Sequence, residues 1–461
     1  MRKLDTPGQN LSYPPHTTTA ASTRSTTPAI HPPGLSTSRR KRNLVPTLIV
    51  SSAVLVSAIL VLASAGLGTF LPSSLFAGNA HSHPATPANR VVGHVLFSSS
   101  GQIRQDSSQG IADEVQLDLS NIPNPAAGKS YYAWLLNDDP VEGRALLLGR
   151  LQVNHSTAHL QYAGDAQHTN LLEVSNRLLI TEEDAAIAPV VPSLDTSTWQ
   201  FVAQFPQTPN PLDTIHHFSL LSHLRHLLAL DPTLQALGMP GGLDIWLLRN
   251  TQKVLEWAGS ARDDWAIQDT ALMHRHIIRI LDYLDGLTYV QNDVPAGTPV
   301  LVDDHIGRVG LLEFDVQNQE PPALLYHIGL HLHGLVQSPG ASAEQKQLAI
   351  QIDAALNKVQ ALLEQVHQDA KQLVLLTGAQ LQQPSSLSLL DDMVKHAQDA
   401  FVGQFDPTTG EIQDGITQIH YAIQRLAIMD VVVMNSTTTK STPDQFFQLR
   451  AEVLSYASVS K

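Results

Sequence analysis

The sequence predicts an α+β multidomain protein: a transmembrane helix, then an antiparallel β-sandwich, then an all-α helical bundle. Three observations predict this fold class. Residues 44–71 form an apolar run without a charged side chain. Between Val91 and Phe205 apolar and polar residues alternate, which is typical of half-buried strands. From Leu212 to about Val433 the apolar spacing becomes three or four residues, as in amphipathic helices. The predicted parts are a disordered basic tail (1–42), a transmembrane helix (43–71), a linker (72–90), the β-sandwich (91–206), the helical bundle (210–435) and a tail with a short helix (436–461).

The apolar run is long enough to cross a bilayer, because a helix rises about 1.5 Å per residue and the hydrocarbon core is about 30 Å thick. It follows the basic cluster Arg39-Arg40-Lys41-Arg42, and such clusters stay on the cytoplasmic side. We therefore predict a single-pass protein of the cell membrane, with a cytoplasmic N-terminus and an extracytoplasmic bulk in the cell envelope. The competing interpretation is a cleaved signal peptide that ends near residues 77–80.

Composition excludes several classes of partner and chemistry. The chain has a formal net charge of −14, so the region after the basic tail is acidic and offers no basic stripe for nucleic acid. It contains no cysteine, which excludes disulfides, thiolate chemistry and Cys-zinc sites. The predicted partners are the lipid bilayer and a partner membrane or envelope protein, with no nucleic acid.

The segment from 91 to 206 predicts about seven short strands separated by turn clusters such as Asn137-Asp138-Asp139-Pro140 and Ala163-Gly164-Asp165. Strands of this length and spacing fit an antiparallel sandwich. Tyr132 and Trp134 are two residues apart and are expected on one face of the sheet, with Tyr131 on the other.

One stretch of this segment carries a family resemblance. Leu119 to Leu136 reads L-S-N-I-P-N-P-A-A-G-K-S-Y-Y-A-W-L-L, and Leu148-Gly149 and Ile180-Thr181-Glu182-Glu183 follow it. This series resembles the extracytoplasmic domain of the anti-sigma-K-factor family over residues 91–206. The resemblance implies a β-sandwich that takes part in envelope signalling. The family's cytoplasmic sigma-binding domain has no counterpart in residues 1–42, so sigma binding is not carried over. No family is recognised in the helical half.

The helical half is divided by Pro and Gly, which mark the expected helix ends. Ser342 and Gln345 fit a capping box at the start of the longest helix. The expected helices cover residues 212–230, 243–259, 261–284, 322–336, 342–376, 385–401 and 412–429.

Histidine is frequent, with 21 residues, and two pairs in the helical half have metal-binding spacing. His223 with His226, and His327 with His331, are separated by three and four residues, so each pair shares a helix face. Two such imidazoles hold a metal ion when another helix adds a ligand, for which Asp282, Glu256 and Asp391 are candidates. The alternatives are structural or surface histidines and a pH sensor.

A second candidate site lies among aromatic and basic residues of the expected helices over 243–259 and 261–284. It is a binding cleft for an anionic ligand or a peptide. Core packing of the tryptophans is the alternative interpretation. The residues of this predicted cleft are Trp246, Arg249, Lys253, Trp257 and Arg262.

No nucleophile elbow, phosphate-binding loop or paired carboxylate site is present in the sequence, so we predict a protein that is not an enzyme. The predicted function is binding, sensing or scaffolding at the membrane, within a signalling system related to anti-sigma regulation. It requires no cofactor. The first alternative is a histidine-rich bundle that binds a metal or haem, and the second is an envelope hydrolase.

Overall fold

The computed structural model describes residues 90–104, 107–138, 145–300, 307–405, 407, 408, 410 and 412–434. All of these fall within one compact unit. The predicted tail over 1–42, transmembrane helix over 43–71 and terminal segment over 436–461 lie outside the described residues, as does all of the predicted linker except Arg90.

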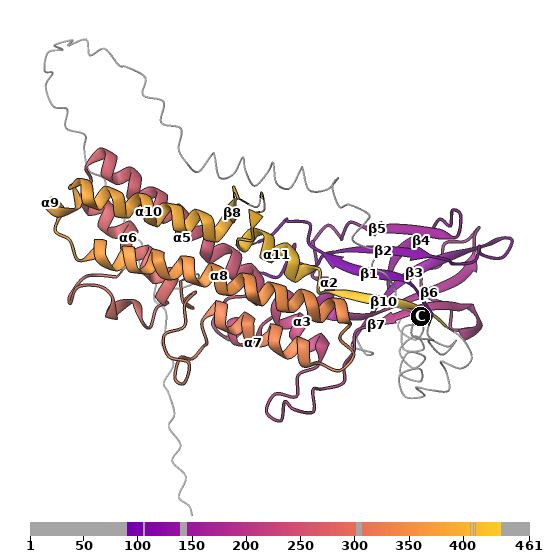
Figure 1. The fold of residues 1–461 in the computed structure, drawn as a ribbon. Helices are drawn as coiled ribbons and strands as arrows, with labels where there is room; N and C mark the ends of the chain where they lie inside the picture. The colour runs from indigo at the N-terminus through magenta and orange to yellow at the C-terminus, as the bar shows by residue number, and fades with distance from the viewer. Residues whose placement is uncertain are drawn as a thin grey trace, which may run out of the picture. The chain divides into compact units, whose positions relative to one another are not determined.

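An eight-stranded antiparallel sheet is the main β structure of the described residues (Figure 1). Its strand order is β4-β3-β6-β7-β10-β1-β2-β5. The sheet is nearly closed, because the two edge strands β4 and β5 contact one another. A side chain at Gly149 of β4 would come 2.9 Å from Leu160 of β5. The strands are β1 (Val91–Ser98), β2 (Glu114–Ser120), β3 (Lys129–Asn137), β4 (Leu146–Leu151), β5 (Thr157–Tyr162), β6 (Ser175–Asp184), β7 (Trp199–Gln204) and β10 (Ile428–Val433).

Strand β10 lies between β7 and β1, although the helical region separates it from β7 in the sequence. It pairs along β1 from Val91 to Leu96 and with Phe201 and Val202 of β7. The helices are therefore inserted between two neighbouring strands of the sheet. Residues 91–206 alone would lack an interior strand.

The two faces of the sheet are both apolar around β3. Tyr131, Ala133 and Leu135 belong to the main core, which continues into the helical region. Tyr132 and Trp134 belong to a smaller cluster on the opposite face. There the Trp134 Nε1–H donates to Thr181 Oγ1 at 2.9 Å. The alternation along β3 correctly predicted which of these aromatic residues share a face.

The helical region is built around the long helices α5, α6, α8 and α10, and α3 with α7 packs beside them (Figure 1). Its apolar side chains join those of the sheet in one continuous core. A short hairpin, β8 (Gln404–Phe405) with β9 (Ile412–Gln413), precedes α11. The helices of the described residues are α2 (Leu171–Val174), η3 (Thr196–Thr198), α3 (Leu220–Leu228), α4 (Pro232–Ala236), α5 (Leu243–Ile267), α6 (Thr270–Asp285), η4 (Val290–Asn292), α7 (Leu324–Gln337), α8 (Ala343–Val374), α9 (Gly378–Leu381), α10 (Pro384–Val402) and α11 (Ile416–Gln424).

Several predicted helix ends differ from the structure. Helix α5 does not stop at Gly259 but continues to Ile267, where Gln268 takes a left-handed conformation and Asp269 caps α6. The expected helix over 412–429 instead contains strand β9, helix α11 and the start of β10. Ile428 and Val431 are three residues apart, as on one helix face, whereas Met429 and Val431 are two apart, as on one strand face; the pairing with β1 decides between the two.

The predicted fold class was wrong. The β part is one nearly closed sheet rather than a two-sheet sandwich, and the helices are inserted into it rather than following it. Alternation predicts that one strand face is buried, but it does not determine whether a second sheet or the same curved sheet covers that face.

The predicted membrane location is also corrected. Within the described ranges, none of the helices combines the length and apolar character that a bilayer crossing requires. A single-pass membrane protein of the cell envelope is therefore not supported.

Candidate metal centre

Helices α3 and α7 place four histidines opposite one another. Helix α3 begins at Ser219, whose hydroxyl forms a capping box with Ser222, and it buries a leucine face. His223 and His226 lie one turn apart on this helix, and His327 and His331 lie one turn apart on α7, which packs against α3. The structure thus brings together the four histidines that the sequence spacing selected.

Asp231 adds a carboxylate from the loop that joins α3 to α4. Its Oδ1 accepts the Leu234 N–H at 2.9 Å, as the N-cap of α4. This bond fixes the side chain and leaves Oδ2 facing the histidines. Oδ2 lies 3.0 Å from His226 Nδ1 and 3.8 Å from His327 Nε2.

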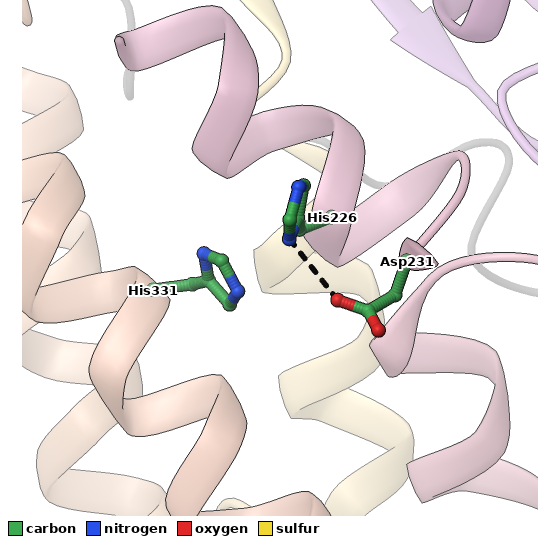
Figure 2. A group of neighbouring side chains, drawn as sticks. All are labelled: His226, Asp231 and His331. Atoms are coloured by element: carbon green, nitrogen blue, oxygen red, sulfur yellow. Dashed lines mark ion pairs between the residues drawn. The ribbon is translucent and has the colours of Figure 1, made fainter. Parts of the chain in front are cut away.

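Figure 2 shows His226, Asp231 and His331 converging on a common point. One donor atom from each of the three lies within 4.8 Å of the other two. Asp231 is fully buried and His331 is 4% exposed. We call His226, Asp231 and His331, with the adjoining His223 and His327, the His226 cluster. Asp231 Oδ2 and His226 Nδ1 face one another as an ion pair, and His327 Nδ1 is buried without a hydrogen-bond partner, so the cluster keeps a ring nitrogen that is not satisfied.

The aromatic ring of Phe218 covers the cluster. Its centroid lies 4.8 Å from that of His226 and 5.4 Å from that of His223. The His226 and His331 rings are themselves 4.6 Å apart. Such close packing suits an ion of single-atom size rather than a haem macrocycle.

Burial keeps several imidazoles of the cluster neutral. It lowers the pKa of His223 to about 4, with a further contribution from the charge of His226. Burial also lowers the pKa of His327 and takes that of His331 well below its usual value. Burial opposes the charge of Asp231, but its interactions with His226 and His327 outweigh this and lower its pKa. The carboxylate of Asp231 and the imidazoles of His327 and His331, which burial keeps neutral, are good metal ligands.

The carboxylates that the sequence suggested as a further ligand lie elsewhere. Glu256 pairs with Lys253 at 2.6 Å, and Asp391 pairs with Arg262 at 3.0 Å. Asp282 is buried in α6, against Gly307. Sequence reasoning missed Asp231, although Asp231-Pro232 directly after a helix is an N-cap signal that places a carboxylate close to the helix end.

The predicted cleft residues lie on α5, and their contacts are with the protein itself. Trp246 is buried, and its Nε1–H donates to the Pro240 carbonyl at 2.9 Å. Arg249 stacks over the Trp246 ring at 5.2 Å and bonds the Arg104 carbonyl. Trp257 stacks on His276 at 5.1 Å. The cations of Lys253 and Arg262 are used in the ion pairs with Glu256 and Asp391, so a ligand would have to compete with these partners.

A second group of convergent donors lies between α6, η4 and α8. His367 Nε2 is 2.9 Å from Asp285 Oδ1 and 2.7 Å from Asp293 Oδ2. Lys371 Nζ is 2.7 Å from Asp293 Oδ1. We call these four residues the His367 cluster. Burial opposes the charge of His367, but the bonds to Asp285 and Asp293 raise its pKa. Two cations therefore face two carboxylates in this cluster.

Ser100, Asp113 and His168 form a third constellation, which resembles a hydrolytic triad in composition only. Asp113 Oδ2 accepts the Ser100 hydroxyl at 2.6 Å and lies 2.8 Å from His168 Nδ1. In a nucleophilic triad the imidazole lies between the serine and the carboxylate. Here Ser100 Oγ is 3.3 Å from His168 Nδ1, the same nitrogen that faces Asp113, and the hydroxyl donates to the carboxylate. The two ring nitrogens do not link the serine to the carboxylate, so the constellation does not support the hydrolase alternative.

Comparisons with known proteins identify no relative of this chain. No protein-family model, no curated protein and no solved structure matches it, and the resemblance to the anti-sigma-K-factor family stays a prediction.

Proposed function

We propose that this protein binds a divalent transition-metal ion, with zinc as the best-fitting ion, through His226, Asp231 and His331. The observation that carries the proposal is the convergence of three buried donor atoms, two of which, Asp231 Oδ2 and His226 Nδ1, form an ion pair with one another (Figure 2). The alternatives of a sensor or a scaffold stay predictions.

The spacing of the donors supports an ion of this class. Zinc binds imidazole nitrogen and carboxylate oxygen at about 2.0–2.2 Å, so neighbouring ligand atoms of a tetrahedral ion are roughly 3.3 Å apart. Asp231 Oδ2 and His226 Nδ1 are 3.0 Å apart, which requires only a small displacement. Imidazole ligands favour zinc, copper, iron or nickel over magnesium and calcium.

The burial of the donors supports a structural role for the ion. A metal ion ties together the elements that supply its ligands, and its binding energy adds to folding stability. Here these elements are α3, the N-terminus of α4 and α7. The ion would hold together the helices that follow β7.

Metal analysis of the purified full chain tests the proposal, with Asp231→Asn as the decisive variant. Asparagine is also a good N-cap, so α4 keeps its cap while the charged Oδ2 is lost. Asp269→Asn is the matched control, because Asp269 caps α6 in the same way at Leu272. We expect a single zinc or cobalt ion per chain in wild type and in Asp269→Asn, and an affinity lower by more than about 100-fold in Asp231→Asn. A wild-type chain without stoichiometric metal, or an Asp231→Asn chain that binds normally, overturns the proposal.

A further inference from the structure

His223 reaches His331 through a gap that exists because residue 334 is glycine. The Nδ1 atoms of the two rings are 3.0 Å apart, and both side chains are buried. A Cβ at Gly334 would lie 2.3 Å from His223 Cε1 and 2.5 Å from His223 Nε2. Gly334 is one turn beyond His331 on α7, so the helix that carries His331 also provides the space for its partner.

The contact determines which nitrogen of His331 remains for an ion. Two neutral imidazole nitrogens at hydrogen-bonding distance share one proton. When His331 Nδ1 carries it and donates to His223 Nδ1, the lone pair of His331 is on Nε2. Figure 2 shows one ring nitrogen of His331 directed towards His226 and Asp231 and the other directed away. With Nδ1 engaged by His223, the nitrogen that faces the ion is Nε2.

We propose that His223 is a positioning residue of the metal site, which holds His331 in the tautomer and orientation that present Nε2 to the ion; this inference rests on the proposed function. Histidines that bind a metal commonly donate their other ring N–H to a fixed acceptor, and loss of that acceptor lowers metal affinity about 10- to 100-fold. His223 would supply such an acceptor without touching the ion. His223 and His226 share a helix face, but His226 would bind the ion and His223 would position His331.

Two alanine substitutions on α7 test the inference without removing a histidine. Gly334→Ala displaces the His223 ring. Gly329→Ala is the matched control, because a Cβ there meets only Asp353 Oδ1 at an ordinary 3.5 Å. Cobalt and zinc affinities of the full chain are measured for both variants, together with His223→Ala and His223→Gln. The visible absorption of bound cobalt reports the ligand set, and circular dichroism verifies that each variant folds.

We expect Gly334→Ala and His223→Ala to lower metal affinity about 10- to 100-fold with an unchanged cobalt band shape. Gly329→Ala should bind as wild type, and His223→Gln should recover part of the loss, because its amide oxygen is also an acceptor. Wild-type affinity in both Gly334→Ala and His223→Ala overturns the positioning role and leaves the metal site intact. A changed cobalt band in His223→Ala overturns it too, since His223 would then be a ligand. A wild-type chain that binds no ion overturns the metal site itself.

Discussion

The His226 cluster and the His367 cluster both bring three donor atoms within 4.8 Å of one another, yet they differ in charge. In the His367 cluster two carboxylates face a histidine of raised pKa and the ammonium of Lys371. In the His226 cluster one carboxylate pairs with His226, and burial lowers the pKa of His223, His327 and His331 beside them. In the His367 cluster, protons on the histidine and the lysine balance the charge of the carboxylates. In the His226 cluster, an added metal cation would stabilise the carboxylate.

This difference teaches that convergence of ligand atoms alone does not define a metal site. A buried carboxylate needs a compensating charge, and a protonated histidine or a lysine supplies it as well as a metal ion does. Convergent donors indicate a metal site where their neighbours leave the charge of the carboxylate uncompensated. Buried oxygens without a hydrogen bond do not separate the two clusters, because Asp285 Oδ1 and Oδ2 lack one as well. We therefore expect the His367 cluster to act as an ionic clamp that holds the η4 segment against α8.

The largest effect is expected from Asp285→Asn, which removes one partner of the clamp. Asp285 is 1% exposed, and breaking a buried ion pair costs about 3–5 kcal/mol. The free energy of unfolding, measured with urea, should fall by that amount, while metal stoichiometry stays unchanged. Asp391→Asn is the matched control in the exposed pair with Arg262, where we expect a loss below about 1 kcal/mol. Loss of bound metal in Asp285→Asn would show that the two clusters had been distinguished wrongly.

The histidines of the two clusters show how much of the sites the sequence predicts. Helical spacing found the pairs on α3 and α7, because residues three or four apart share a face whatever the tertiary fold. Helical spacing did not identify Asp231 and Asp285, because a carboxylate from another element approaches a histidine only through tertiary packing. For the same reason β10 was not predicted: its partners in β1 and β7 lie far away in the sequence. The sequence did not indicate a role for Gly334, because only the packed structure shows that the His223 ring occupies the place of a side chain at residue 334.

The contributions of the two clusters to the free energy of unfolding should change in opposite directions with pH. The pKa of His223 is lowered from 6.5 to about 4, so the unfolded chain binds the proton first as pH falls. The stability that neutral His223 provides is present above about pH 6.5, and up to about 3 kcal/mol of it is lost by about pH 4. The pKa of His367 is raised, so its contribution is present below about pH 6.5 and is lost as pH rises through the folded-state value.

Urea unfolding of the metal-free chain between about pH 4 and 9 tests this prediction. His223→Gln should lose less stability than wild type on acidification. His367→Gln should be destabilised most at low pH, and its difference from wild type should narrow above about pH 6.5. Parallel pH profiles for the two variants would contradict the assignment of protons to the clusters.

Added zinc should stabilise the chain through the His226 cluster alone. A ligand that binds only the folded state at 100 times its Kd adds about 2.7 kcal/mol to the free energy of unfolding. Wild type and Asp285→Asn should both show this increase, and Asp231→Asn should not. An increase that disappears in Asp285→Asn but persists in Asp231→Asn would place the ion in the other cluster.

The smallest effect is expected at the surface, where the same residue types meet without burial. His94, Asp118 and His159 are registered across β1, β2 and β5, and His159 Nδ1 lies 2.6 Å from Asp118 Oδ1. These side chains are about half exposed, so water solvates both groups and competes with the pair. Asp118→Asn should change the free energy of unfolding by less than about 1 kcal/mol in urea titrations, with no change in bound metal. A loss comparable to that of Asp285→Asn would mean that close contact between histidine and aspartate, rather than burial, determines how strongly such pairs act in this fold. These exposed pairs are thus the reference for both buried clusters, because their histidine–aspartate contacts are similarly short but lie in water.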